Sequence, residues 1–391
     1  MSCPTVSMAR SPTYDEDRAL EAVKETFAPL GGMKAYVRPG MRVLVKPNLL
    51  SPRPPDQAVQ PILPSSRPWF TLVQECGGRA VIGDSPGGRQ TEASYRRLLR
   101  TTGMAGVIEE TGCEWVYFYG ETATVRAPEA RTFRRFTIAQ ATLEADVIIG
   151  LPKLKTHALT SYTGAVKLMY GCVPGVSKAA YHLHAGQNPE TFADLLLDLH
   201  TLLRPTLSVM DAVIGMEGKG PQHGDPREIG LVLASESRTA LDYVAATLVA
   251  LDPATIPTLA RAAARGEGPA CLEEVEVGGP PLEAVQVRDF IPAPTSLHPA
   301  LPSFVRELGG NLVPARPVID GEQCRRCGIC AECCPPGAIM WSKDTISAID
   351  TAHCTRCFCC QELCPEETVD LRESYSKRPM MMNKRFPLER P

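Results

Sequence analysis

The sequence lacks the features that mark an exported, membrane-spanning or nucleic-acid-binding protein. Its formal net charge is only −3, from 41 lysines and arginines against 44 aspartates and glutamates. This balance points neither to nucleic acid nor to an anionic membrane surface. The chain has no basic start followed by an apolar run, and no stretch of about eighteen unbroken apolar residues. We therefore expect a cytoplasmic protein without a membrane span.

Cysteine, by contrast, is abundant, with 15 residues in a chain of 391. Eight of these cysteines form two runs with the spacing CxxCxxCxxxCP, about thirty residues apart. The runs are Cys324, Cys327, Cys330 and Cys334, and then Cys354, Cys357, Cys360 and Cys364. This spacing is typical of a bacterial-type ferredoxin with two 4Fe-4S clusters, because each run supplies three ligands to one cubane. A zinc ribbon or a disulfide knot, the alternatives, does not explain two proline-closed runs of four thiols.

The fourth ligand of each cluster is expected to come from the other run. Cys364 would then complete the first cluster, and Cys334 would complete the second. Cys333 and Cys359 lie beside ligands but occupy no motif position, so we interpret them as spare thiols. We predict a small bacterial-ferredoxin-like α+β domain over residues 317–373, followed by a basic tail over residues 374–391.

The first 316 residues alternate short apolar runs with amphipathic segments, which predicts an α/β domain whose mostly parallel sheet is sandwiched by helices. The predicted strands are 42–46, 80–83, 115–119, 145–150, 207–213, 230–234 and 285–288. The predicted helices are 20–30, 69–76, 92–99, 188–203, 241–251 and 255–265. Proline-rich stretches at 51–68 and 292–302 are typical of a surface loop and a linker.

Polar residues follow several of these predicted strands. Parallel strands deliver their carboxyl ends to one edge of a sheet, where open α/β sheets bind ligands. We therefore predict that residues at these ends bind a further small-molecule cofactor, although the turn from 84 to 88 also suits a plain tight connection. The candidate cofactor-binding residues are Lys46, Asn48, Asp84, Gly87 and Asp211.

The segment from 151 to 184 contains four lysines and three histidines, interspersed with small and apolar residues. A solvated basic loop is the simplest alternative, but the apolar neighbours favour a lined cleft for an anionic small molecule. Burial would make a lysine here a base, an anion clamp or a covalent attachment point. The candidate catalytic residues are Lys153, His157 and Lys167.

Five motifs together resemble the family catalogued as domain of unknown function 362, over roughly residues 43–252. They are KPNLL, GDSPGG, LPKLKTH, TGAVKLMYGCVPG and DAVIGMEGKGPQHG. The resemblance implies an α/β domain joined to a two-cluster ferredoxin module, without an assigned reaction. The order His157, Lys167, Pro174-Gly175 and then His182 or His184 is similar to that in the amino-terminal domain of nickel-pincer lactate racemase. That second resemblance implies nickel-cofactor attachment at Lys167.

Three hypotheses follow for function. The first is an iron-sulfur oxidoreductase, in which two 4Fe-4S clusters relay electrons between a redox partner protein and a substrate or cofactor bound at the strand ends. The second is a non-catalytic electron carrier or a cluster-bearing assembly module. The third is a redox-neutral, racemase-like enzyme. Convergence of the core candidates in one pocket would favour an enzyme, because a docking surface has no need to gather them there.

Overall fold

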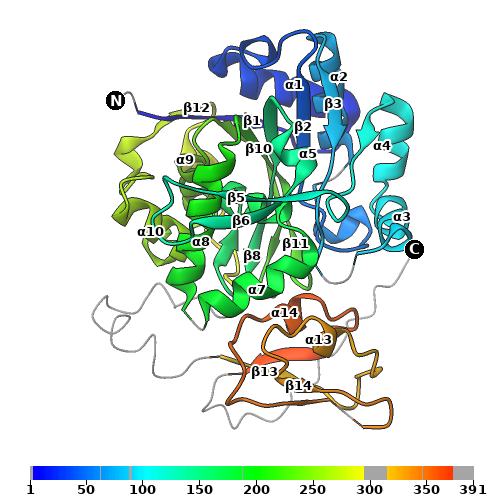
Figure 1. The fold of residues 1–391 in the computed structure, drawn as a ribbon. Helices are drawn as coiled ribbons and strands as arrows, with labels where there is room; N and C mark the ends of the chain where they lie inside the picture. The colour runs from blue at the N-terminus through cyan, green and yellow to red at the C-terminus, as the bar shows by residue number, and fades with distance from the viewer. Residues whose placement is uncertain are drawn as a thin grey trace, which may run out of the picture.

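The structure is a computed structural model that describes residues 3–61, 63–87, 90–186, 188–294, 315–345 and 347–372 (Figure 1). Within these residues, ten strands form one sheet, in which the order β12-β1-β11-β10-β7-β2-β3-β4 is extended by β8 and β9. The strands are β1 (Thr5–Arg10), β2 (Arg42–Pro47), β3 (Arg79–Ile82), β4 (Glu114–Trp115), β7 (Val147–Leu151), β8 (Lys153–His157), β9 (Ser161–Thr163), β10 (Leu207–Glu217), β11 (Asp225–Ser235) and β12 (Glu276–Gly278).

Most neighbouring strands of this sheet are parallel, from β10 through β7, β2 and β3 to β4. Strand β11 is antiparallel to both β10 and β1. The remaining hairpin, β5 (Thr122–Arg126) with β6 (Arg135–Ala139), lies outside the sheet. The predicted α/β fold with a mostly parallel sheet is confirmed.

Helices cover both faces of the sheet, because alternate residues of each central strand bury apolar side chains on opposite sides. Val43 and Val45 pack with α1 and α2, whereas Leu44 between them packs with α8. The helices are α1 (Glu16–Phe27), α2 (Leu63–Glu75), α3 (Glu92–Thr101), α4 (Met104–Thr111), α5 (Gln140–Leu143), α6 (Ala165–Leu168), α7 (Gly175–Ala185), α8 (Pro189–Leu203), α9 (Arg238–Leu248), α10 (Pro257–Ala264) and α11 (Leu282–Val285).

Several local predictions need correction. Helix α2 begins at Leu63, so the last third of the expected loop over 51–68 is helical, and Val59 within that stretch is fully buried. The expected strand over 285–288 is wrong, because Val285 ends helix α11. Val285 and Val287 pack against the hydrophobic cluster that contains Leu248 of α9. The amide of Val287 donates to the carbonyl of Leu248 at 2.8 Å instead of pairing with a neighbouring strand.

The chain reverses direction around β2, which places a crevice at the carboxyl end of that strand. After β2 the chain adds β3 and β4 on one side, and it later returns to add β7 on the other side. Such a reversal separates the connections that follow the two neighbouring strands, and it is the usual ligand-binding place in open α/β sheets.

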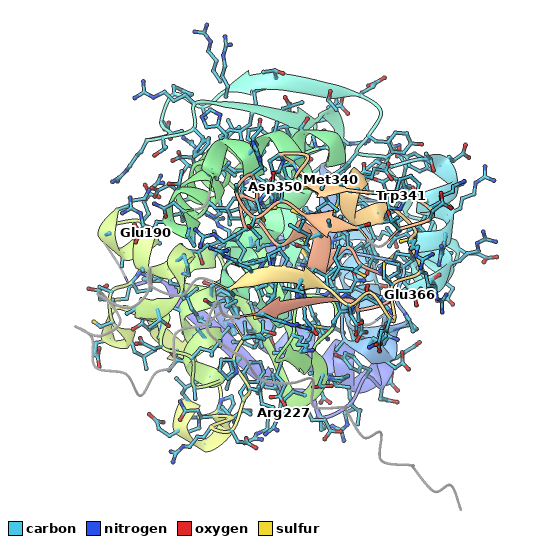
Figure 2. The ribbon with its side chains drawn as sticks, turned by 90° about the horizontal axis from the view of Figure 1, so that it is seen from below. Glu190, Arg227, Met340, Trp341, Asp350 and Glu366 are labelled. Carbon is cyan, nitrogen blue, oxygen red and sulfur yellow. The ribbon has the colours of Figure 1, made fainter. Side chains whose placement is uncertain are left out.

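A small C-terminal module lies against this edge of the core, coloured orange in Figure 1. It consists of β13 (Arg316–Ile319), α13 (Ile329–Glu332), β14 (Ile339–Met340), β15 (Ala348–Ile349), α14 (Cys359–Glu362) and β16 (Val369–Arg372). Strands β13 and β16 pair, as do β14 and β15, both antiparallel. Figure 2 shows the module from below, with Met340 and Trp341 on its outer surface. The predicted tail over 374–391 and the prolines Pro299 and Pro302 lie outside the described residues.

Polar contacts join the module to the core. Arg53 donates to the carbonyl of Pro365 at 3.0 Å, and Lys219 lies 3.2 Å from the carboxylate of Asp370. The cavity edge is closely packed, because a Cβ added to Gly87 would lie 2.7 Å from Cδ2 of Leu363. The sheet edge that collects strand ends is therefore covered by the cysteine-rich module.

Candidate functional site

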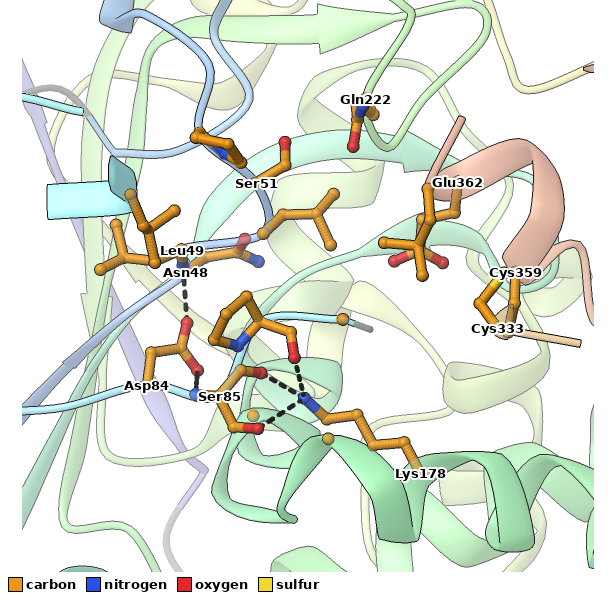
Figure 3. Close-up of a pocket in the computed structure, with 18 of the residues that line it drawn as sticks. Asn48, Leu49, Ser51, Asp84, Ser85, Lys178, Gln222, Cys333, Cys359 and Glu362 are labelled. Atoms are coloured by element: carbon orange, nitrogen blue, oxygen red, sulfur yellow. Dashed lines mark hydrogen bonds between the residues drawn. The ribbon is translucent and has the colours of Figure 1, made fainter. Parts of the chain in front are cut away.

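A cavity of about 1200 Å³ lies between the strand ends of the core and the C-terminal module (Figure 3). The wall contributed by the core follows strands β2, β3 and β8 and one side of helix α7. The opposite wall comes from helices α13 and α14 of the module. Six of the predicted core residues line this cavity: Lys46, Asn48, Asp84, Gly87, His157 and Lys167.

Lys46 and Asp84 form a buried ion pair at the base of the cavity, with 2.9 Å between Nζ and Oδ1. The carboxylate also accepts hydrogen bonds from the amides of Leu49, at 2.6 Å, and Ser85, at 2.7 Å. Gly171 leaves room for this pair, since a Cβ there would lie 2.2 Å from Asp84 and 2.3 Å from Lys46. The pair therefore ties the ends of β2 and β3 together and has little capacity left for a ligand.

His157 is buried and presents one nitrogen toward the module. Its Nδ1 accepts hydrogen bonds from the amides of Leu159, at 3.0 Å, and Thr160, at 3.4 Å, which assigns the proton to Nε2. Nε2 lies 3.6 Å from Oε2 of Glu362. Burial, followed by the charge of Lys167, lowers the pKa of His157 to about 4. The imidazole is therefore neutral at pH 7.

Two lysines of the core wall differ in how their ammonium groups are satisfied. Lys178 donates to the hydroxyl of Ser85 at 3.2 Å and to the carbonyl of Pro86 at 3.4 Å, as well as to the carbonyl of Ser85. Burial lowers its pKa to about 8. Lys167 also has a pKa lowered by burial, which the nearby Glu362 opposes. Among the described residues, the ammonium of Lys167 makes no hydrogen bond or ion pair.

Lys153 and Asp211, two further candidates, lie outside the described lining of this cavity. They form a separate buried ion pair at 3.0 Å, and the hydroxyl of Tyr14 lies 2.9 Å from each of them. The segment after β7, expected to be a cleft-lining loop, forms strand β8 instead. Lys153 is four residues before His157 on that strand, or about 13 Å at the rise of a β-strand. It therefore lies on the body of the sheet and not at its end.

The sequence analysis did not single out Lys155, which lies on β8 between those two positions. Its Nζ donates to Oδ1 of Asn48 at 3.2 Å and to the carbonyl of Val59 at 2.7 Å. Burial, and then the charge of Lys167, lowers its pKa to about 7. The alternation of Lys153, Lys155 and His157 on one face was a usable strand signal. The side chain of Asn48 is thus already engaged by a protein donor.

The module supplies cavity residues that sequence reasoning assigned no role in a core site. They are Glu332 and Cys333 near the end of α13, and Cys359 and Glu362 on α14. Figure 3 shows Glu362 directed into the cavity from the module, across from Asp84 and Lys178. Burial alone would raise the pKa of Glu362, but His157 and Lys167 hold it well below its usual range. Glu362 is therefore ionised.

The predicted cluster ligands also converge in part. Cys334, Cys354, Cys357 and Cys360 line one small cavity together with apolar residues such as Ile339 and Ile349. This is the set expected for the second cluster, including the crossing ligand. For the first set, Cys330 lies within electrostatic range of Cys324 and Cys327, and Cys364 is buried.

The two cysteine runs share one backbone course. Left-handed φ angles recur thirty positions apart, at Arg326 (58°) and Arg356 (53°) and again at Gly328 (81°) and Phe358 (59°). The amides of these two arginines each approach the preceding cysteine sulfur at 3.4 Å. Amides directed at thiolate sulfurs suit cluster ligands. Within the described residues no group of His, Cys, Asp or Glu is arranged to hold a single metal ion, so the cluster ligands stay a prediction.

Comparison with known proteins places this site in a family. The sequence profile described as domain of unknown function (DUF362) matches residues 43–247, which include every core residue named above that lines the cavity. The chain belongs to the DUF362 family. A thylakoid-associated protein of Synechocystis sp., sll1697, is 38% identical over 274 residues, which are 69% of this chain and 82% of the relative.

Solved structures resemble the DUF362 chain only distantly. The lactate racemase apoprotein from Thermoanaerobacterium thermosaccharolyticum aligns with a TM-score of 0.38 at 11% identity, over 62% of this chain and 57% of the racemase. A Thermotoga maritima protein aligns with a TM-score of 0.35 at 11% identity, over 58% of this chain and 56% of its own length. No helix in the described part of the DUF362 chain is long and apolar enough to cross a bilayer.

Proposed function

We propose that this protein is an iron-sulfur oxidoreductase, in which two 4Fe-4S clusters of the C-terminal module exchange electrons with a ligand in the interface cavity. One observation carries the proposal: a single cavity is walled by the strand ends of the core and by residues adjoining the cluster cysteines. Of these residues, Cys359 directly precedes the predicted ligand Cys360, and Glu362 lies between the predicted ligands Cys360 and Cys364. An electron carrier that only docks a partner would have no need for such an enclosed, cation-lined space.

The cluster ligands in this proposal are the two sets expected from the sequence. The first is Cys324, Cys327, Cys330 and Cys364, and the second is Cys354, Cys357, Cys360 and Cys334. The cavity that Cys334 shares with the three thiols of the other run supports the second set. When bound, each cluster supplies one-electron transfer, so the two together match a two-electron reduction or oxidation.

The residues of the core bind and orient the ligand. The Lys46–Asp84 pair and Lys178 hold the turn after β3 in place, through contacts within the protein. Lys167 and His157 lie on the same wall of the cavity, opposite the module. The low local dielectric at buried positions strengthens the attraction between these donors and an anion.

A redox-neutral, racemase-like enzyme is the second candidate. It is favoured by the presence of His157, Lys167 and His182 in one cavity, in the order expected from the resemblance to the nickel-pincer racemase. In that case Lys167 would be the attachment point of the cofactor, and the clusters would take no part in turnover.

The test is anaerobic purification followed by metal analysis, identification of any copurified small molecule, and redox titration monitored by electron paramagnetic resonance. The oxidoreductase proposal expects about eight irons and eight sulfides per chain. It also expects a bound ligand to be reduced or oxidised as the clusters change state. Stoichiometric nickel with silent clusters during turnover would favour the racemase-like enzyme. Reducible clusters with no ligand effect would favour the electron carrier.

A further inference from the structure

Two hydrogen-bond donors on the core wall of the cavity have no acceptor. Among the described residues, the ammonium of Lys167 makes no hydrogen bond or ion pair, although it lines the cavity. Nε2 of His157 is buried without a hydrogen-bond partner, in a side chain that is 3% exposed. Leaving a buried donor unsatisfied costs about 1–3 kcal/mol, so Nε2 of His157 indicates a missing acceptor, whereas the half-buried ammonium of Lys167 faces the cavity.

The other two lysines of this wall, Lys46 and Lys178, are already engaged. Lys46 pairs with Asp84, and Lys178 is held by the hydroxyl and carbonyl of Ser85 and by the carbonyl of Pro86. Arg97 also lines this wall, but it is exposed to solvent. Lys167 is therefore the lysine of this wall whose ammonium is unused, and it lies in the same cavity as His157.

A carboxylate of the module already faces these two donors. Oε2 of Glu362 lies 3.6 Å from Nε2 of His157, which is longer than a hydrogen bond. Glu362 therefore offsets the positive charge of Lys167 without accepting a hydrogen bond from Nε2 of His157. It shows that a carboxylate is compatible with this part of the cavity, and a ligand oxygen would reach the buried Nε2 by displacing Glu362.

We propose that Lys167 and His157 form a subsite for the carboxylate of an organic acid, and that Glu362 is its built-in competitor. This inference rests on the proposed function, because it names the class of ligand that the same cavity receives. The planar carboxylate accepts one hydrogen bond from the imidazole and one from the ammonium, on its two oxygens. Its negative charge is then opposed by Glu362, so the affinity for the acid depends on the charge of that side chain.

The test measures binding of acetate to the anaerobically prepared holoprotein by calorimetry at constant ionic strength, with inorganic phosphate as the comparison. Lys167→Met is expected to weaken acetate binding about tenfold or more, because a charge-assisted hydrogen bond is lost. Glu362→Gln is expected to tighten it several-fold, because a like charge is removed at nearly constant shape.

Two matched controls accompany these variants. Glu332→Gln removes the carboxylate at the equivalent position of the other cysteine run. Glu332 lines the cavity but forms no ion pair with His157, so a smaller effect is expected. Lys24→Met removes an exposed lysine on α1, and it should leave binding unchanged. Iron content is measured for every variant. If Glu362→Gln loses iron, acetate binding to Lys167→Met still tests the subsite, because that substitution changes the core alone.

Unchanged acetate affinity in Lys167→Met, or weaker binding in an iron-replete Glu362→Gln protein, would overturn the proposal. Phosphate binding more tightly than acetate, with the same dependence on Lys167, would overturn the choice of a carboxylate. Acetate affinity is measured without electron transfer, so this test can fail or succeed independently of the proposed oxidoreductase function. Acetate binding with this pattern in a protein whose clusters never exchange electrons with a ligand would sink the oxidoreductase and leave the subsite standing.

Discussion

The core and the C-terminal module are stabilised in different ways. The core buries long apolar stripes on both faces of its sheet, and it pairs the buried charges of Lys46 and Lys153 with Asp84 and Asp211. Among the described residues, the hydrophobic cluster of the module has four buried members, Ile339, Cys360, Cys364 and Val369. Two of these, Cys360 and Cys364, are predicted metal ligands. A segment this small rarely holds together by burial alone. We therefore expect the core to fold by packing and, under the proposed function, the module to fold around its clusters.

Removal of iron gives the largest expected effect on this comparison. Anaerobic chelation should unfold most of the module, because binding of the metal supplies its folding free energy. The core should remain folded. Hydrogen exchange by mass spectrometry is the measurement, with protection lost over 316–372 and retained in β2, β7 and α8. A module that keeps its protection without iron would remove the distinction between the two regions.

Loss of a single crossing ligand sharpens the comparison within the module. Cys334→Ser should damage the cluster held by Cys354, Cys357 and Cys360, and spare the one bound by its sequence neighbours. Cys333→Ser is the matched control and should leave both clusters in place. Electron paramagnetic resonance with iron analysis distinguishes them. Equal losses in the two variants would refute the ligand assignment.

Breaking a buried ion pair tests how the core holds its strand ends. Asp84→Asn should destabilise the core by about 3–5 kcal/mol, because it leaves the ammonium of Lys46 buried without a counter-ion. Urea unfolding followed by far-ultraviolet circular dichroism measures this loss. Glu92→Gln on α3, at an exposed ion pair with Arg96, should cost under about 1 kcal/mol. Similar losses in both variants would argue against the buried pair as a fixed support.

A pH titration gives the smallest effect. The folded pKa of Lys155, about 7, lies below its ordinary value of 10.5, so the unfolded chain binds more protons between these values. Core stability should therefore rise with pH across that window, by up to about 1.4 kcal/mol per pH unit from this residue. Lys155→Met should flatten this slope relative to Lys24→Met. An identical slope in the two variants would show that Lys155 is not the source.

The sequence predicted the class of the fold and much of the cavity wall. Lys46 lies at the end of the apolar strand β2, and Asp84 follows the apolar strand β3. Both strands have a clear sequence signal, so the meeting of these two side chains at one sheet edge was predictable. Lys153 was expected near the strand ends because its segment was interpreted as following a strand, although the alternation along β8 was itself a strand signal. Glu362 could not be connected with His157, since they are 205 positions apart and the placement of the module on the core has no sequence signal.

Gly87 of the core packs directly against Leu363 of the module, where an added Cβ would lie 2.7 Å from Cδ2 of Leu363. Electron tunnelling slows exponentially as the gap between donor and acceptor widens. Under the proposed function, this glycine acts as a spacer of minimal thickness. A bulkier residue at this position would widen the separation between core and module and slow electron transfer between them.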